Sequence, residues 1–513
     1  MNRRELLKLS SYAVAAASAP ALASPSRAPS EPAQNVQRWD AIELTHPGPT
    51  GGNPFVDVSL SATFRLGNRA LTVEGFYDGG GAYKIRFMPD ELGTWAWTTT
   101  SNAAALNGKT GSFTCVSPEP GNHGPVSVSD GFHFACADGR PWVECGTTCY
   151  AWAFQSEDTQ RQTLATLSSS PFNKLRMCLF PKWYQHNRKE PSTYPFPRSG
   201  ETNDFSAFNV EYFQHFDKLI VALGSLGVQA DLILFHPYDK WGYQSMPAEV
   251  DDRYLRYVIA RFSAYRNVWW SLANEFDLLK SKTTADWDRY ARILGEYDAF
   301  NHLRSIHYSR YQYEYGRGWC SHAGVQDSRM QLGAQWRSDW GKPVVFDECR
   351  YEGNIGSRWG NISGDAMTRR FWQAAAQGCY CGHGETYLDA NDILWWSHGG
   401  VLHGTSPAKI AFLRKLLEET IALGPGPIGF TNFNDDPMGA RRANGSVIFY
   451  YFDEHQPAEG AFQLPEGKTY TAEFIDTLQL TRIPIPGDYS GNAQVKLPGT
   501  PWGSLWFREK GVA

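Results

Sequence analysis

Between residues 121 and 427, short apolar segments alternate with amphipathic ones, and this alternation constrains the fold more than any other feature of the chain. Each apolar segment has the length of a strand that is buried on both faces. The segments between them, 211–223 and 251–265 most clearly, place apolar residues at steps of three and four, as a helix with one buried face does. A strand–helix rhythm of this kind predicts a parallel sheet.

Eight strand segments can be placed in this region, and eight strands closed by eight helices make a (β/α)8 TIM barrel of ordinary size. An open doubly wound sheet would show the same alternation, but no Gly-rich phosphate-binding turn follows the first strand. We therefore expect the barrel. The expected strands are residues 141–150, 173–180, 228–236, 268–274, 304–308, 320–325, 343–348 and 378–384.

The segments on either side of the barrel have the pattern of antiparallel β-structure. In residues 36–120, apolar and polar residues alternate strictly along 56–64, and Gly-rich turns such as 78–81 separate the strands. Residues 428–513 return to the same pattern, most clearly at 446–452. We expect an N-terminal and a C-terminal β-sandwich domain, and a chain of 513 residues has room for both beside the barrel.

The first 35 residues are expected to be a signal peptide followed by a disordered start of the mature chain. Arg3 and Arg4 form a twin-arginine pattern, residues 9–19 are moderately apolar, and Ala-Leu-Ala at 21–23 fits a cleavage site. The alternative is a basic amphipathic N-terminus. Because the apolar stretch is too short to remain in a bilayer, we expect an exported bacterial protein, periplasmic or secreted, without stable membrane insertion.

Replacing both arginines by lysine, as Arg3→Lys with Arg4→Lys, should hold the precursor inside the cell, because the twin-arginine route reads that pair. Cell fractionation should then find the wild-type protein outside the cytoplasm, beginning near Ser24, and the double variant within it. Export of the double variant at the wild-type level would contradict the twin-arginine interpretation.

Composition excludes some partners and favours a sugar. A net charge of -5 leaves no broad basic field for nucleic acid. Aromatic residues make up 14% of the chain, and rings beyond those needed for the core suit the flat apolar faces of sugars. Cys145 with Cys149, and Cys379 with Cys381, have spacings that metal ligands use, but they lie in apolar strands and are expected to be buried free thiols. We expect neither a cofactor nor a metal.

Two acidic residues end expected strands at the mouth of the barrel, where TIM-barrel enzymes carry their chemistry. Glu275 follows a buried strand and Asn274, and Glu348 ends a second strand next to Asp347. By our count these are strands four and seven, on opposite sides of the mouth. Two carboxyls that face one cavity can cleave a glycosidic bond, one protonated and the other ionised. Asp347 is the rival of Glu348, but adjacent strand residues point to opposite sides, so both cannot face the cavity.

These motifs resemble those of the apiosidase-like glycoside hydrolases, within the clan A type of TIM barrel. The resemblance is carried by Trp-Ser-Leu-Ala-Asn-Glu-Phe at 270–276, by Lys-Pro-Val-Val-Phe-Asp-Glu at 342–348 and by Gly-His-Gly-Glu-Thr-Tyr at 382–387. The flanking domains are similar too. The N-terminal one contains Tyr-Lys-Ile-Arg-Phe-Met-Pro at 83–89, and the C-terminal one is of a type labelled collagen-binding, a label for which this chain gives no reason. The resemblance implies retention of configuration, with Glu275 as acid/base and Glu348 as nucleophile.

The resemblance also implies that Asn274 donates to the sugar hydroxyl beside the anomeric carbon, and that Arg176 on strand two keeps the nucleophile ionised. A buried structural ion pair is the alternative for Arg176. The irregular segment 184–209 is expected to wall the pocket. Further candidate sugar ligands are His236, His307, Tyr308, His322 and Glu385, with Trp152 and Trp183 as stacking platforms, and a structural role is the alternative for each.

The sequence therefore predicts a retaining glycoside hydrolase that acts on terminal or side-chain sugars of plant or microbial glycans. One alternative is a transglycosylase on the same scaffold. Another is a non-catalytic carbohydrate-binding or matrix-binding protein, which would be expected to lack one of the two glutamates. The expected partner is an oligosaccharide or glycoside.

Overall fold

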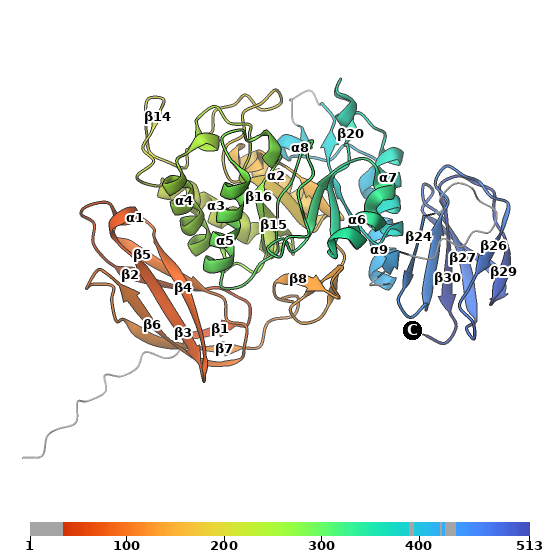
Figure 1. Ribbon diagram of the computed structural model, residues 1–513, viewed down its shortest axis with the longest axis horizontal. Helices are drawn as coiled ribbons and strands as arrows, with labels where there is room; N and C mark the ends of the chain where they lie inside the picture. Colours follow the sequence, from red (N-terminus) through yellow and green to blue (C-terminus); the bar gives the residue numbers. More distant parts are fainter. Residues whose placement is uncertain (1–33, 389–393, 421–422, 426–437, 513) are drawn as a thin grey trace, which may run out of the picture.

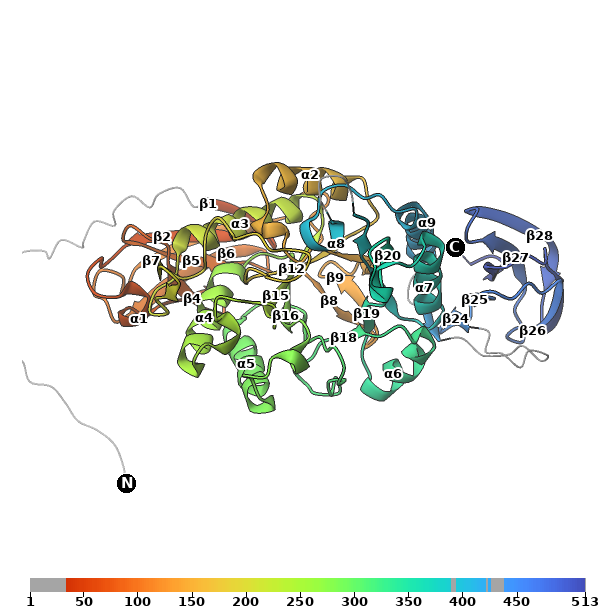
Figure 2. The same ribbon diagram turned by 90° about the horizontal axis from the view of Figure 1, so that it is seen from above.

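The structure is a computed structural model that describes residues 34–388, 394–420, 423–425 and 438–512. Figures 1 and 2 show three domains in a row, with the barrel between two β-sandwiches. This arrangement confirms the predicted fold class. The predicted signal segment lies outside the described residues, except for its last two residues, which open the strand β1 (Gln34–Gln37). Within the described ranges, no helix is long and apolar enough to cross a membrane.

Eight parallel strands close into the barrel, and each falls on one of the predicted segments. Every strand pairs with its neighbour in the chain, and the first strand pairs with the last. A bridge between His307 and Gly324 completes the ring between the fifth and sixth strands. The strands are β11 (Gly146–Thr148), β12 (Lys174–Cys178), β15 (Gln229–Phe235), β16 (Val268–Ala273), β17 (Arg304–Ser305), β18 (Ala323–Gln326), β19 (Val344–Glu348) and β21 (Tyr380–His383).

Helices follow seven of these strands, so the prediction of eight helices is wrong at one place. Residues 306–322, all of them described, link β17 to β18 without a helix. Gly316 and Gly318 lower the helix propensity there, and the Tyr315 hydroxyl donates to the Ile306 carbonyl at 2.8 Å. The barrel helices are α2 (Glu157–Ser168), α3 (Val210–Ser225), α4 (Ala248–Phe262), α5 (Thr284–Tyr297), α6 (Gly333–Trp340), α7 (Gly364–Ala376) and α9 (Ser406–Thr420).

A small antiparallel sheet covers the amino-terminal end of the barrel, below the barrel strands in Figure 1. It consists of β8 (Val126–Ser129), β9 (His133–Cys136) and β10 (Pro141–Trp142). Phe134 packs against Trp269 at 5.2 Å and Tyr380 at 5.1 Å between ring centroids, and the three rings form a buried cluster. The apolar plug keeps solvent out of this end, so substrates reach the barrel from the opposite one.

The N-terminal domain packs seven strands around its own core, in the order β1-β7-β6-β3-β4-β5-β2. Phe64 and Phe87 stack at 4.0 Å between its two layers. Arg86 binds Asp217 of α3 at 2.6 Å, and this ion pair fastens the domain to the side of the barrel. The remaining strands are β2 (Ile42–Pro47), β3 (Leu60–Leu66), β4 (Arg69–Tyr77), β5 (Ala82–Phe87), β6 (Gly93–Ser101) and β7 (Thr110–Val116).

The C-terminal domain packs against α7 on the other side of the barrel. Trp372 of α7 stacks on Tyr451 at 5.7 Å, and Arg369 binds Asp453 at 2.5 Å. The strands are β23 (Leu423–Pro425), β24 (Met438–Arg442), β25 (Val447–Tyr451), β27 (Tyr470–Asp476), β28 (Thr481–Tyr489) and β30 (Gly503–Glu509) in one sheet, and β26 (Glu459–Gln463) and β29 (Asn492–Lys496) in the other.

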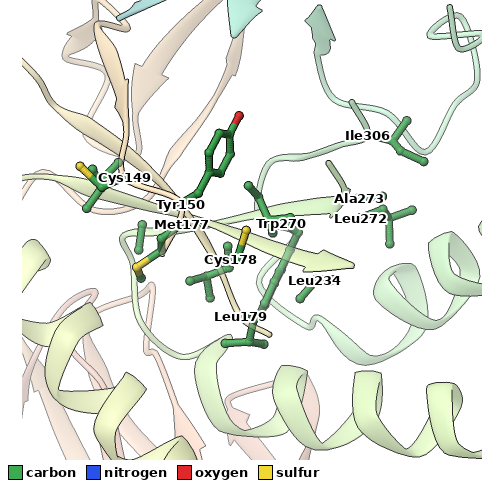
Figure 3. Packing of buried hydrophobic residues seen from close by; sticks show 14 of the residues in the cluster. Cys149, Tyr150, Met177, Cys178, Leu179, Leu234, Trp270, Leu272, Ala273 and Ile306 are labelled. Carbon is green, nitrogen blue, oxygen red and sulfur yellow. The ribbon is translucent and has the colours of Figure 1, made fainter. Parts of the chain in front are cut away.

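Buried side chains fill the layer between the barrel strands and the helices (Figure 3). Tyr150 stands at the edge of this layer, with its hydroxyl pointing away from Cys178 and Leu179. The nine cysteines are buried free thiols, as predicted for the two close pairs. Short elements complete the description: α1 (Pro54–Asp57), β13 (Arg198–Ser199), β14 (Thr202–Asn203), β20 (Glu352–Gly353), β22 (Glu385–Thr386) and α8 (Trp395–His398).

Candidate active site

A cavity of about 620 Å³ opens at the carboxyl ends of the barrel strands. As far as the structure describes them, the two flanking domains contribute no residue to its wall and pack on the sides of the barrel. The segment 184–209 does contribute, through its first three residues. The lining residues that matter below are Tyr150, Lys182, Tyr184, Tyr238, Asn274, Glu275, Gln326, Glu348, Trp359 and Trp396.

Glu275 reaches this cavity because the chain turns sharply after β16. The Asn274 amide still donates to the Phe235 carbonyl at 3.0 Å, as in the strand ladder, but Glu275 has φ 52 and ψ 54, in the left-handed region. Such a backbone costs about 1–3 kcal/mol for a non-glycine residue and is concentrated at functional sites. The Glu275 carboxylate accepts hydrogen bonds from the Tyr238 hydroxyl and, at 3.3 Å, from the Gln326 side chain.

Glu348 enters the cavity from β19, across from Glu275. Its carboxylate accepts a hydrogen bond from the Tyr150 hydroxyl, and the His307 ring lies 3.9 Å away. Between Gly324 and Gln326 of β18 the register with β19 shifts, so that one extra residue of β19 is accommodated before Glu348. A bulge of this kind re-aims the side chains that follow it.

Asp347, the predicted rival, does not line the cavity. Its carboxylate points into the barrel interior, where it binds Lys174 at 2.9 Å and Arg176 at 2.6 Å. Gly324 leaves the space for it, since a Cβ at that position would lie 2.6 Å from a carboxylate oxygen of Asp347. As strand alternation predicted, only one of the two adjacent acids faces the cavity, and it is Glu348.

Arg176 therefore has a different partner from the one predicted. It pairs with Asp347 and donates to the Asn274 side chain at 3.3 Å, and no direct bond joins it to Glu348 among the described contacts. Burial raises the pKa of Asp347, but Arg176 and Lys174 outweigh it and hold that pKa well below its ordinary value. The buried structural ion pair, left open by the sequence, describes the direct contact of Arg176, while its charge still lowers the pKa of Glu348 as the resemblance implied. Breaking such a pair by removing one partner costs about 3–5 kcal/mol.

The two carboxylates that do face the cavity influence each other. Burial and the charge of Glu275 together raise the pKa of Glu348 to about 7, although the Tyr150 hydroxyl, Arg176 and Lys182 act against this rise. Two interacting carboxyls lose their protons in two steps, and the pKa of each step belongs to the pair and not to one residue. Below a pH of about 7 the pair therefore keeps a proton that its two carboxyls share.

Three of the predicted histidines lie outside the cavity wall or behind it. His236 donates to the Phe180 carbonyl at 3.0 Å and accepts from the Tyr238 amide at 3.2 Å, so it positions Tyr238 instead of binding sugar. His322 packs on Trp269 at 5.2 Å, at the closed end of the barrel. His307 lies behind Glu348, and burial lowers its pKa well below the ordinary value. Each therefore has the structural role that was the alternative.

The other predicted ligands are also placed elsewhere. Tyr308 is buried outside the wall that the described residues form. Trp152 is wholly buried in the core, and Trp183 packs against Trp241 outside the cavity. Glu385 is buried and accepts hydrogen bonds from the amides of residues 403 and 404. Of the predicted residues, Asn274, Glu275 and Glu348 line the cavity.

Sequence reasoning missed the aromatic residues that do line it. Tyr150 follows the first strand and Tyr238 the third, and each donates to one of the two carboxylates. Trp396 in α8 and Trp359 lie against each other at 4.9 Å between ring centroids. The sequence did offer a hint for Trp396, because this residue follows the eighth strand, where loop residues of a TIM barrel reach the mouth.

Glu352, His383 and Glu385 form the one buried group among the described residues whose ligand atoms could hold a metal ion. The four carboxylate oxygens already accept hydrogen bonds from the amides of residues 403–406, at the start of α9. Amide donors at the start of a helix stabilise ionised carboxylates. This group lies outside the cavity and fastens α9 to the barrel.

The geometry defines a class of protein. A closed parallel barrel with one carboxylate directly after its fourth strand and one at the end of its seventh, both facing one polar cavity with aromatic walls, is the arrangement of TIM-barrel glycoside hydrolases. The profile of the family described as apiosidase-like, catalytic domain, matches residues 129–418. The chain belongs to this family, and it is a glycosidase with a carbohydrate substrate. Domains of unknown function named DUF5060 and DUF5605 match residues 35–102 and 435–507.

Solved structures agree with this assignment. A candidate glycoside hydrolase from Bacteroides vulgatus is 36% identical, with a TM-score of 0.88 over 93% of this chain and 100% of that one. A family 5 glycoside hydrolase from the same organism shares the fold alone, at 14% identity, with a TM-score of 0.57 over 77% of this chain and 95% of that one. No curated protein matches this chain.

Proposed function

We propose that the protein is a retaining glycosidase in which Glu348 is the nucleophile and Glu275 the acid/base. The observation that carries this assignment is the pair itself: two carboxylates after strands four and seven face one cavity, and each accepts a hydrogen bond from a tyrosine hydroxyl. Double displacement requires the proton of the pair to lie on Glu275 when substrate is bound, and we assign the raised pKa at Glu348 to the pair as a whole.

In the first step the Glu348 carboxylate attacks the anomeric carbon while protonated Glu275 gives its proton to the leaving oxygen. The C–O bond to the leaving group breaks, and an ester forms between the sugar and Glu348. Tyr150 and the charge of Arg176 favour the ionised form of Glu348, which is the attacking form. The side-chain oxygen of Asn274 accepts a hydrogen bond from Arg176. The side-chain NH2 group of Asn274 is then free to donate to the hydroxyl beside the anomeric carbon.

In the second step Glu275, now ionised, takes a proton from water, and that water attacks the anomeric carbon and releases Glu348. Two inversions give net retention. A sugar hydroxyl in place of water would make the reaction a transglycosylation on the same scaffold, and added acceptor alcohols measure that share directly.

We propose exo action on terminal or side-chain sugars of plant or microbial glycans, because Tyr184 and His186 pack on the Trp359–Trp396 pair and close one side of the cavity with a continuous aromatic wall. A screen of aryl glycosides, furanosides included, should identify the sugar. On an oligosaccharide ladder, monosaccharide should then appear from the first time point, with the configuration of the substrate by NMR. A spread of intermediate oligomers would contradict exo action, and an inverted product would contradict the double displacement.

A further inference from the structure

Lys182 occupies an unusual place in the cavity wall. It is 1% exposed, and its ammonium lies over four aromatic rings, 3.8 Å from the centroid of Tyr150, 4.5 Å from Tyr238, 4.6 Å from Tyr184 and 5.3 Å from Trp396. Among the residues that the structure describes, Glu275 and Glu348 act on this ammonium through their charges, and neither forms an ion pair with it. A buried ammonium without a paired carboxylate is costly, so the rings and the more distant charges must hold it.

Two of these rings belong to the tyrosines that bind the carboxyl pair. Tyr150 donates to Glu348, and Tyr238 donates to Glu275. A cation over the face of an aromatic ring is attracted by its π electrons and draws electron density from the ring, which makes the phenol hydroxyl a stronger donor. Lys182 therefore strengthens the hydrogen bond that each carboxylate accepts, through Tyr150 for Glu348 and through Tyr238 for Glu275.

The charge of Lys182 also acts directly. Burial lowers the pKa of Lys182, and the charges of Glu275 and Glu348 are among those that oppose this. In return Lys182 lowers the pKa of Glu348, against burial and the charge of Glu275. An opposite charge at short range shifts a carboxyl pKa downward, so the effects through the rings and through space add.

We propose that Lys182 is a positioning residue that holds Tyr150 and Tyr238 against the two carboxylates and sets the pH range in which the pair keeps a single proton. The proposal rests on the proposed function only where it speaks of catalysis; its electrostatic part concerns the folded protein alone. The other titratable or charged groups around the pair are Arg176 from β12, His307 after β17 and Tyr351 after β19, and the same cavity is lined by Tyr184, His186, Asp327 and Arg350.

The test is a titration of Glu348 in the full-length protein. With glutamate labelled by 13C in its side-chain carboxyl, the Glu348 signal is the one that disappears in Glu348→Gln. Lys182→Met keeps the length of the side chain and removes its charge, and it should raise the midpoint of the Glu348 titration by about one pH unit. Lys182→Arg keeps the charge and should restore most of the wild-type midpoint.

Lys240→Met is the matched control. Lys240 also lies over an aromatic ring, 3.5 Å from the centroid of Trp183, but outside the cavity wall. Lys240→Met should leave the midpoint of the Glu348 titration unchanged. If Lys182→Met also leaves the midpoint unchanged, the inference is overturned, whether or not the protein cleaves glycosides.

Kinetics supply the second measurement. Once a substrate is known, the alkaline limb of kcat/KM should move upward in Lys182→Met by the same interval as the titration. A raised KM with an unmoved pH profile would make Lys182 a simple substrate ligand and overturn the positioning role. A shifted titration in a protein that stays active as Glu348→Gln would instead refute the proposed function and leave the electrostatic role of Lys182 standing.

Discussion

Glu348→Gln should reduce turnover on the order of 10⁴-fold or more, because an amide cannot form the covalent glycosyl ester and removal of a nucleophile costs this much or more in other enzymes. The fold should survive. Glu348 lines an open cavity instead of the packed core, and the change removes its repulsion with Glu275. Steady-state kinetics with an aryl glycoside measure the loss, and thermal unfolding should show a midpoint at or above that of the wild type.

Asp347→Asn is the matched comparison, since the two acids are adjacent in sequence. Asp347 is paired with Lys174 and Arg176 inside the barrel, so its replacement leaves buried cations with less compensation. We expect a clear loss of thermal stability, consistent with the cost of breaking a buried pair, about 3–5 kcal/mol. If Asp347→Asn abolished turnover without loss of stability while Glu348→Gln stayed active, the two roles would have to be exchanged.

Glu275→Gln should slow cleavage of natural glycosides by about 10²–10⁴-fold, the usual contribution of general acid catalysis. Aryl glycosides with very acidic phenol leaving groups need little protonation, so their first step should be nearly as fast as in the wild type. Release of the sugar still needs a general base, so a burst of phenol should precede a slow steady state. Stopped-flow absorbance measures both phases, and the absence of a burst with equal loss on all substrates would argue against the acid/base role.

The pH profile of Glu275→Gln gives an independent check. In the wild type, kcat/KM should fall as the pH rises through about 7, because the pair loses the proton that the leaving group needs. Glutamine neither titrates nor repels Glu348, so this alkaline fall should disappear and the pKa of Glu348 should drop. An unchanged alkaline limb would assign it to another group.

Azide distinguishes the two glutamates by stereochemistry. In Glu348→Ala the small anion can attack from the vacated face and give a glycosyl azide of inverted configuration. In Glu275→Ala it attacks the glycosyl ester on Glu348 and gives an azide with the configuration of the substrate. NMR of the two products measures the configuration of each glycosyl azide. If the two variants gave the opposite configurations, the roles of Glu275 and Glu348 would be exchanged.

Much of the barrel could be predicted because each strand is a short run of apolar residues that can be recognised from neighbouring positions alone. Segments such as 268–273 are apolar on both faces, a pattern that a parallel strand covered by helices requires. The same reasoning placed Glu275 and Glu348 at the mouth, since a polar residue directly after such a run has left the core. Strand alternation also predicted that only one of Asp347 and Glu348 faces the cavity, and the family resemblance selected Glu348.

Other features depend on contacts between distant segments. The partner of Arg176 is Asp347 on a strand far away in the sequence. The predicted first strand, 141–150, begins with Pro141 and Trp142, which belong to the plug, because a short apolar strand has the same local pattern in the barrel and over its end. The link 306–322 carries no helix because its own packing, including Tyr315, replaces one.

The sequence by itself thus determined the fold class, the flanking domains and the position of the two carboxylates at the barrel mouth, because the burial and the period of a strand depend on the order of neighbouring residues. Only the tertiary structure decided what surrounds those carboxylates. Tyr150, Lys182 and Tyr238 follow three separate strands and meet only when the barrel closes. Their proximity is a property of the ring of strands, and no local pattern of residues encodes it.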